Sequence, residues 1–272
     1  MNKSNHVITL TTDFGVKDAF VATMKGVILS ICSEARIVDI SHEVPKYNIR
    51  YGAFLLSQAS PYYPKGTIHV AVIDPGVGTD RRRIIVEGRR EIYVGPDNGV
   101  FSMVMELEGV VRVVEIRDKR FMLPHVSNTF EGRDVFAPVA AHLAKGVKIE
   151  EFGPEIQDPV KLQMSRVEIV GRTVVGEIIH IDGFGNIITN IQMSSLKEAK
   201  LAGGCRLMVG INKISKEMPF CKAYGEMPVG KLLTIIGSSG FMEISVNQGS
   251  AEMVFKAEVG DAVKLSLVKK VA

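Results

Sequence analysis

The sequence predicts an α/β N-terminal domain with a largely parallel sheet, followed by a small all-β, barrel-like C-terminal domain. In the first part, segments rich in β-branched residues alternate with segments that carry apolar residues at helical spacing. After residues 153–159, which contain one glycine and two prolines and are typical of a linker, short strands separated by glycines follow. The 272 residues suffice for two domains. We place these domains at residues 1–160 and 161–272.

The elements of the N-terminal part follow one another in a regular order. Strands are expected at residues 7–12, 36–40, 67–73 and 110–116, with a hairpin formed by residues 84–87 and 91–95. Helices are expected at residues 20–31, at 49–59, from residue 100, and after residue 134 up to Gly146. The first helix has an apolar face made by Phe20, Val21, Met24, Val27, Ile28 and Ile31.

The C-terminal part has short apolar segments and almost no helical spacing. Glycines separate these segments, as in small barrels or sandwiches. Strands are expected at residues 173–181, 185–191, 205–211, 232–236, 242–246 and 262–268.

Three of the N-terminal strands end at an aspartate next to a glycine-containing turn. These residues are Asp13, Asp74 and Asp97. Ligands of open α/β sheets bind at the carboxyl ends of the strands. Because parallel strands end at the same edge, we expect the three carboxylates to lie along one rim and to form a site there.

The stretch IDPGVGTDRRR at residues 73–83 is the strongest single candidate for a site. Pro75 ends the preceding strand because it has no N–H to donate. Gly76 and Gly78 let a ligand approach the backbone closely. Arg81 follows Asp74 by seven residues and brings a positive charge. The alternative is an ordinary turn with solvated arginines that protect an edge strand.

Composition excludes several classes of protein. The net charge of +3 is small and the basic residues are scattered, which gives no support for nucleic-acid binding. Apolar runs are too short to span a membrane, and the start of the chain does not resemble a signal peptide. Three distant cysteines form neither a disulfide framework nor a zinc motif. We therefore expect a cytoplasmic protein.

Five motifs resemble those of the S-adenosyl-L-methionine (SAM) hydrolases, also called SAM hydroxide adenosyltransferases, which are relatives of fluorinases and chlorinases. The resemblance extends from residue 7 to residue 267, and five ordered motifs make it specific. The motifs are TTDFG at 11–15, VIDPGVGT at 72–79, GPDNG at 95–99, TFEGRD at 129–134 and DGFGN at 182–186.

This resemblance implies a reaction and an assembly. Water or hydroxide is expected to attack C5′ of SAM and to release adenosine and methionine. The sulfonium is already an excellent leaving group, so neither a cofactor nor a metal is required. Members of the family form homotrimers that hold the ligand between the α/β domain of one subunit and the β domain of its neighbour.

The resemblance also implies roles for individual residues. Catalysis is expected from Asp74, Arg81 and Glu131. Substrate contacts are expected from residues of both domains: Asp13 at the ribose hydroxyls, Tyr47 against the nucleoside, Asp182 at the methionine ammonium, Ser238 at the methionine carboxylate, Asn186 at the adenine, and Glu243, Ser250 and Ala251 at the purine end.

One position departs from the family pattern, which reads Thr-Phe-His-Gly-Arg-Asp where this chain has Glu131. Glutamate can also accept a proton. A second carboxylate near Asp74 should raise one pKa of the pair while Arg81 lowers it. His125 is an alternative replacement, whereas strand alternation points His69 away from Asp74. The remaining alternative is that activity is weakened or lost.

The resemblance favours the hydrolytic branch over the halogenating one. In the halogenating relatives the position of Asp74 is not an acid, and a hydroxyl residue replaces Gly132. This chain keeps both Asp74 and Gly132. A carboxylate at position 74 would repel a halide nucleophile.

Two rival functions belong to other classes. The first is a protein that binds adenosine or SAM without turnover, an alternative prompted by Glu131. The second is a metal-dependent phosphoesterase built on Asp13, Asp74 and Asp97, which would lose activity with a chelator. No histidine accompanies these acids at the spacing of a metal ligand, so the hydrolase is the favoured interpretation.

Overall fold

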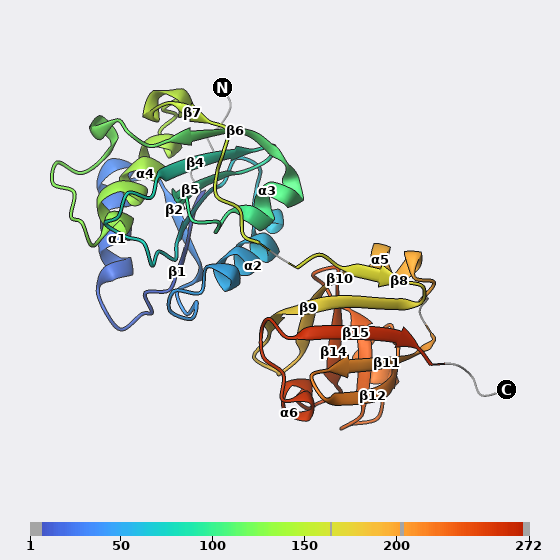
Figure 1. Ribbon diagram of the computed structural model, residues 1–272. Helices are drawn as coiled ribbons and strands as arrows, with labels where there is room; N and C mark the ends of the chain where they lie inside the picture. Colours follow the sequence, from blue (N-terminus) through green and yellow to red (C-terminus); the bar gives the residue numbers. More distant parts are fainter. Residues whose placement is uncertain (1–6, 164, 202–203, 269–272) are drawn as a thin grey trace. The chain divides into compact units, whose positions relative to one another are not determined.

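The structure is a computed structural model that describes residues 7–163, 165–201 and 204–268. It divides into two compact units, one ending at Leu162 and the other beginning at Gln163. The sequence placed a domain boundary after residue 160. Figure 1 shows the two units, each with its own sheet.

The N-terminal unit is built on a seven-stranded mixed sheet with the order β2-β1-β3-β5-β4-β6-β7. Neighbours β2, β1, β3 and β5 are parallel, whereas β4 and β7 run against the other strands. The predicted sheet of mostly parallel strands is therefore confirmed. The strands are β1 (Val7–Thr12), β2 (Arg36–Ser41), β3 (Ile68–Val72), β4 (Arg83–Gly88), β5 (Ile92–Pro96), β6 (Val110–Glu115) and β7 (Glu155–Ile156).

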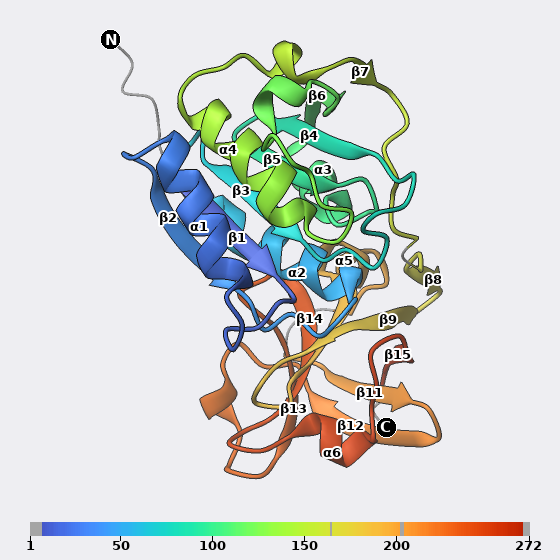
Figure 2. The same ribbon diagram turned by 90° about the vertical axis from the view of Figure 1, so that its left-hand side faces the viewer.

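Helices cover both faces of this sheet (Figures 1 and 2). The face under α1 (Phe20–Ile31) and α4 (Ala137–Ala144) buries Leu10, Val70 and Val72. The face under α2 (Ile49–Ala59) and α3 (Ser102–Glu108) buries Ala71 and Ile73. Alternate residues of β3 thus enter different cores, as expected for a strand covered on both faces.

Some expectations for this unit were wrong in detail. Phe20, which belongs to the apolar face expected for the first helix, is 46% exposed. The helix expected from residue 100 begins at Ser102, since a turn at Gly99 precedes it. Strand β7 lies inside the stretch interpreted as a linker and pairs with β6. A strand of two residues is too short to produce alternation in the sequence.

Short helical segments complete the unit. They are the 3₁₀ segments Ser60–Tyr62, Lys119–Phe121 and Ile149–Phe152, and the π-helical turn Gly132–Phe136 that leads into α4.

The C-terminal unit is an antiparallel, nearly closed barrel-like sheet, in agreement with the sequence. Its strand order is β12-β11-β15-β9-β10-β14-β13, and β8 pairs with β9. A bridge between Phe220 and Thr234 links the two ends of this order. The strands are β8 (Glu168–Val170), β9 (Thr173–Ile181), β10 (Ile187–Gln192), β11 (Arg206–Ile211), β12 (Ile214–Pro219), β13 (Leu232–Ile236), β14 (Phe241–Val246) and β15 (Ala262–Leu267).

The sequence missed four short elements of this unit. They are strands β8 and β12, and the helices α5 (Met193–Glu198) and α6 (Ala251–Phe255). A 3₁₀ segment at Tyr224–Glu226 precedes β13. Strand β12 has three consecutive exposed polar residues, Ser215, Lys216 and Glu217, which hide the alternation of a strand in the sequence.

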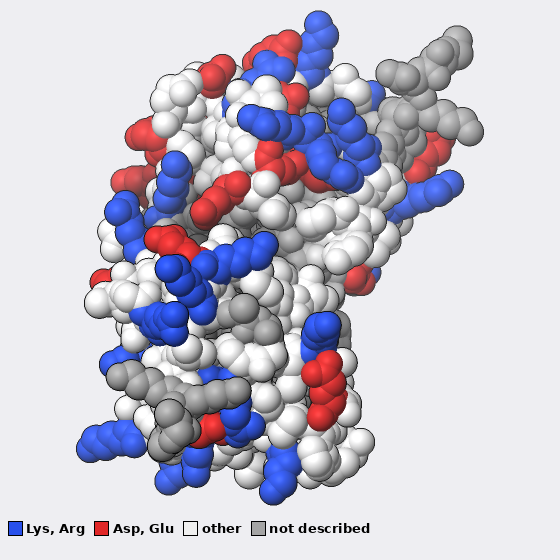
Figure 3. Space-filling model, turned by 90° about the vertical axis from the view of Figure 1, so that its right-hand side faces the viewer, with Lys and Arg blue, Asp and Glu red and all other residues white. Residues whose placement is uncertain are grey.

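The distribution of charged side chains on the surface does not indicate a particular partner. On the face of the N-terminal unit in Figure 3, basic and acidic side chains are interspersed rather than gathered into a patch of one sign. Within the described ranges, none of the helices has the length and apolar character needed to cross a bilayer.

Candidate active site

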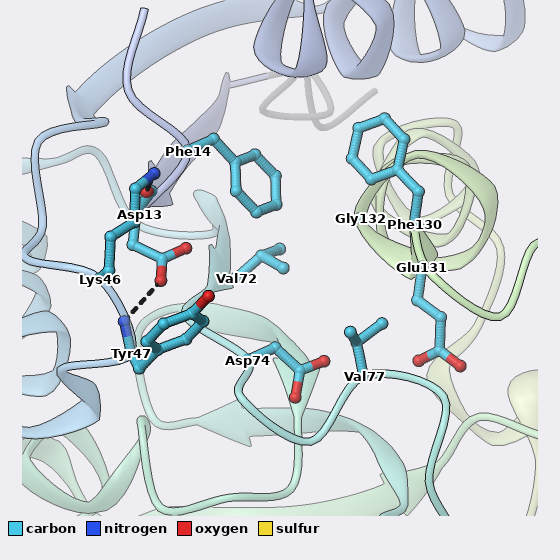
Figure 4. Close-up of a pocket in the computed structure, with 10 residues that line it drawn as sticks. All are labelled: Asp13, Phe14, Lys46, Tyr47, Val72, Asp74, Val77, Phe130, Glu131 and Gly132. Atoms are coloured by element: carbon cyan, nitrogen blue, oxygen red, sulfur yellow. Dashed lines mark hydrogen bonds between the residues drawn. The ribbon is translucent and has the colours of Figure 1, made fainter. Parts of the chain in front are cut away.

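A pocket opens in the N-terminal unit where β1 and β3 end. Its volume is about 230 Å³. Figure 4 shows the carboxylate of Asp13 on one side, those of Asp74 and Glu131 on another, and aromatic rings between them. The lining residues are Asp13, Phe14, Lys46, Tyr47, Val72, Asp74, Val77, Phe130, Glu131 and Gly132.

The guanidinium of Arg81 joins two of these carboxylates. Its Nε lies 3.0 Å from each carboxylate oxygen of Asp74. One terminal nitrogen donates to both Asp74 Oδ2 and Glu131 Oε2. The side chains of Asp74, Glu131 and Arg81 are only 4%, 2% and 10% exposed, so this contact is nearly dry. Charge-assisted hydrogen bonds are stronger in such surroundings than in water.

The loop after β3 places Arg81 beside Asp74. Gly78 has a φ of +78°, and a Cβ there would collide with the backbone carbonyl of Asn128. The Thr79 hydroxyl donates to the carbonyl oxygen of Gly76 at 2.7 Å, which tightens the turn. The chain therefore reverses within a few residues, and Arg81 points back at the acid that ends the preceding strand.

Glu131 is held by a second arginine. Its Oε1 accepts a hydrogen bond from the terminal nitrogen of Arg83, and its Oε2 accepts one from Arg81. Burial acts to raise the pKa of Glu131, but the hydrogen bonds and charges of Arg83 and Arg81 outweigh it and keep the pKa below its ordinary value. The sequence led us to expect one raised pKa in the pair; the pKa of Glu131 is instead lowered, because Arg83 adds a second positive charge that the expectation did not include.

Asp13 organises the opposite side of the pocket. Its Oδ2 accepts a hydrogen bond from the backbone N–H of Tyr47 at 2.8 Å, and its carbonyl oxygen accepts one from the Lys46 ammonium. Tyr47 has a φ of 65°, a left-handed conformation that is uncommon for a residue with a Cβ. Tyr47 is 68% exposed and lines the pocket. Strain of this kind is often found at functional sites.

Aromatic side chains form a third side. Phe14 and Phe130 line the pocket, and Phe20 contacts both of them without lining it. The three rings meet edge-on or tilted, with centroids 5.2–5.8 Å apart. A Cβ on Gly132 would come within 3.3 Å of both the Met24 sulfur and the Phe130 ring. Glycine at this position therefore leaves the rings room to pack.

The three consecutive arginines are not a solvated edge. Strand β4 lies inside the sheet, between β5 and β6. Arg82 binds Asp97 and Asp158, while Arg81 and Arg83 point to Glu131. The edge-strand interpretation was therefore wrong, because all three arginines bind carboxylates.

Asp97 ends β5 at the same rim as Asp13 and Asp74 but does not line the pocket. One carboxylate oxygen binds Arg82, and the other accepts the backbone N–H of Val160 at 2.8 Å. Asp97, the expected third acid of the site, therefore fixes the segment around Val160 at the end of the N-terminal unit. Among the described residues, no group of three or more His, Cys, Asp or Glu side chains is arranged to bind a metal ion.

In the C-terminal unit, the turn between β9 and β10 holds Asp182 and Asn186 together. Asp182 Oδ1 accepts the backbone N–H groups of Phe184 and Asn186, and Oδ2 accepts the Asn186 side-chain amide, all at 2.9 Å. Ser250 caps α6 and packs against Gly185, which has no room for a Cβ. Ala251 is the first residue of α6 and is buried. Four predicted residues therefore gather at one end of this unit.

Glu243 lies on β14 and accepts a hydrogen bond from the Tyr224 hydroxyl at 2.6 Å. Burial raises the pKa of Glu243, and the nearby charge of Asp182 adds to this. The sequence did not identify Tyr224, since no motif surrounds it. Ser238 precedes β14 and is exposed, whereas Ser250 follows β14. The fold therefore separates these two serines along the strand.

Comparisons with known proteins identify the family. The model of the SAM hydroxide adenosyltransferase N-terminal domain matches residues 8–153, and that of the C-terminal domain matches residues 176–264. The chain belongs to the SAM hydroxide adenosyltransferase family. It is 38% identical to an (R)-S-adenosyl-L-methionine hydrolase of Methanocaldococcus jannaschii, with 95% of each chain covered. A hydrolase of the same name from Thermus thermophilus is 36% identical and covers 93% of this chain and 97% of its own length.

A solved structure and a second group of relatives agree with this family. An uncharacterized conserved protein from Thermotoga maritima has a TM-score of 0.92 at 35% identity, covering 95% of this chain and 99% of the other. Fluorinases are more distant, and that of Nocardia brasiliensis is 24% identical over 98% of each chain. The individual roles assigned to the site residues of this chain stay predictions.

Neither histidine considered as a replacement reaches the pocket. His125 is exposed on a loop and does not line it. His69 is fully buried in the other core, where Nδ1 lies 2.7 Å from the Thr9 hydroxyl and the ring stacks on Tyr93. Burial lowers the pKa of His69 from 6.5 to about 3. The folded protein therefore keeps this imidazole neutral.

This burial has a consequence for stability at acid pH. The unfolded chain binds a proton at His69 near pH 6.5, whereas the folded chain does so only near pH 3. The wild type should therefore lose stability through this group as the pH falls between those values. His69→Gln should lack that loss. As the pH is lowered from 6.5 to 3, its free energy of unfolding, measured in urea, should therefore fall less steeply than that of the wild type. His125→Gln is the exposed control, and parallel curves for wild type and His69→Gln would contradict the assignment.

Proposed function

We propose that this protein hydrolyses SAM to adenosine and L-methionine by attack of water at C5′. The observation that carries the proposal is the nearly dry Asp74–Arg81 pair beside the pocket, in a chain 38% identical to a relative named (R)-S-adenosyl-L-methionine hydrolase. The proposed reaction consumes one water and releases a proton. The C5′–S bond breaks, and its electron pair stays on the methionine sulfur.

Asp74 and Arg81 are the proposed catalytic residues. The sulfonium leaves without acid catalysis, so the site needs only a nucleophile aligned opposite sulfur. Asp74 accepts a hydrogen bond from water and orients it. Because both carboxylate oxygens of Asp74 already accept hydrogen bonds from Arg81, the main role of Asp74 is to orient the water. The positive charge of Arg81 stabilises the oxygen as it becomes hydroxide-like.

The substrate contacts follow from the two units. Asp13 binds the ribose hydroxyls, and Tyr47 packs on the nucleoside. In the C-terminal unit, Asp182 and Ser238 bind the amino-acid end, whereas the purine end is contacted by Asn186, Glu243, Ser250 and Ala251. No cofactor and no metal takes part, and the site of action is the cytoplasm.

The active assembly is a homotrimer whose sites lie between subunits. Pockets for ligands the size of a drug usually measure roughly 300–1,000 Å³, whereas the pocket of the N-terminal unit measures about 230 Å³. It therefore accommodates only part of SAM. The polar cluster around Asp182 and Asn186 in the C-terminal unit supplies the missing contacts from a neighbouring subunit.

Two rival functions are less well supported. A metal-dependent phosphoesterase requires Asp97 as a ligand, but Arg82 and the Val160 amide occupy its carboxylate. A non-catalytic binding protein was prompted by Glu131. Relatives with 34–38% identity are named hydrolases, so that alternative is not favoured.

The direct test is a chromatographic assay of purified protein with SAM. We expect equal amounts of adenosine and methionine, with or without a chelator. Asp74→Ala should lower kcat by about 10²-fold or more, because the oriented water is lost. Asp80→Ala, in the exposed part of the same loop, is the control. SAM recovered intact, or activity that a chelator abolishes, would contradict the proposal.

The shared site has its own test. Asp74→Ala and Asn186→Ala subunits should each be nearly inactive alone. If sites form between subunits, co-expressed mixtures regain activity, because some sites combine an intact N-terminal unit with an intact C-terminal unit. If each chain builds its own site, every site in the mixture contains either the Asp74 or the Asn186 substitution, and the mixture stays inactive. Sedimentation should give about three times the chain mass of 29.7 kDa.

A further inference from the structure

Glu131 is the carboxylate at the pocket that two arginines hold. Each of its two oxygens accepts a hydrogen bond from a different arginine, Arg81 on one side and Arg83 on the other. Its side chain is 2% exposed. A carboxylate held in this way has little capacity to take a proton from water. Its position beside Asp74 therefore requires another explanation than base catalysis.

The charges of the four side chains balance. Asp74 and Glu131 are two buried carboxylates that share one guanidinium, that of Arg81. With Arg81 alone, the group would carry an excess negative charge in a nearly dry place, which is costly. Arg83 supplies the second positive charge. The charges of two other carboxylates, Asp74 and Glu115, also act on Arg83.

Arg83 is fixed from outside the pocket. It is the first residue of β4, and its carbonyl oxygen accepts the N–H of Ile116 at 2.7 Å. Its side chain is 34% exposed, so its charge remains partly hydrated. It does not line the pocket. The side chain of Arg83 is therefore joined to the catalytic pair by its hydrogen bond to Glu131, and its charge also acts on Asp74.

We propose that Arg83 is a positioning residue for the hydrolysis of SAM. By binding one oxygen of Glu131, it prevents Glu131 from drawing Arg81 away from Asp74. Arg81 then keeps the orientation in which it holds both oxygens of Asp74. This inference rests on the proposed function, and it assigns Glu131 to the support of Arg81 rather than to proton transfer.

The first test is kinetic. Arg83→Ala should lower kcat by about tenfold or more, as removal of outer groups that orient active-site side chains commonly does. KM should change little, because Arg83 does not contact the pocket. Arg83→Lys keeps the charge and should recover part of the loss. Arg112→Ala is a matched control, since Arg112 is equally exposed and pairs with Glu87 elsewhere on the same sheet. A wild-type kcat in Arg83→Ala would overturn the proposal.

The second test asks whether Arg83 acts through Glu131. Glu131→Gln removes the charge that Arg83 balances, so adding Arg83→Ala to it should cost much less than in the wild type. Losses that multiply in the double variant would show independent roles and would overturn the proposal. In Arg83→Ala, kcat should also begin to fall at a higher pH on acidification. Glu131→Gln should show no such shift when Arg83 is removed.

A third measurement does not depend on turnover. The carboxyl carbon of Glu131, assigned by comparison with Glu131→Gln, can be followed by NMR during a pH titration. Removing Arg83 should move this titration to higher pH, and Arg112→Ala should leave it in place. An unmoved titration would overturn the pairing. A wild type that shows this titration but releases no adenosine would refute the proposed reaction and leave only the pairing of Arg83 with Glu131.

Discussion

The site depends on the contact of one guanidinium with two buried carboxylates. Two acids so close together, with little water around them, would normally force one of them to take up a proton. Arg81 prevents this by binding Asp74 and Glu131 at once, and Arg83 adds a second positive charge. The result is a compact, electrically balanced group in which the position of each charge is set by hydrogen bonds. Such preorganised charges stabilise a developing oxyanion without rearrangement during the reaction.

The fold brings this group together from three separate segments. Asp74 follows β3, Arg81 and Arg83 lead into β4, and Glu131 precedes the π-helical turn Gly132–Phe136. π-Helical turns are rare and often occur at functional sites. Because β1 and β3 are parallel neighbours, Asp13 ends at the same rim and provides the polar group on the far side of the pocket. The arrangement separates the group formed by Asp74, Arg81 and Glu131 from Asp13 and Tyr47 on the other side of the pocket.

Much of this fold could be predicted from the sequence, because its central strands are apolar on both faces and its helices have a clear apolar face. The aspartates at the strand ends, Asp13, Asp74 and Asp97, could also be identified in the sequence. Asp97 was misjudged, since the sequence does not reveal that Arg82 neutralises it. Arg83 was missed because its partner Glu131 lies 48 residues away. That pairing depends on where β4 begins and on where the π-helical turn after Glu131 begins. Neither position is encoded by local spacing in the sequence.

The central claim is that water attacks C5′ of SAM, and the most direct test uses ¹⁸O-labelled water. The account predicts adenosine with ¹⁸O in its 5′-hydroxyl and methionine without label from the same reaction. Asp74 would then be orienting the oxygen that appears in adenosine. Labelled homoserine with methylthioadenosine, or labelled methanol with S-adenosylhomocysteine, would show attack at a different carbon and would contradict the account.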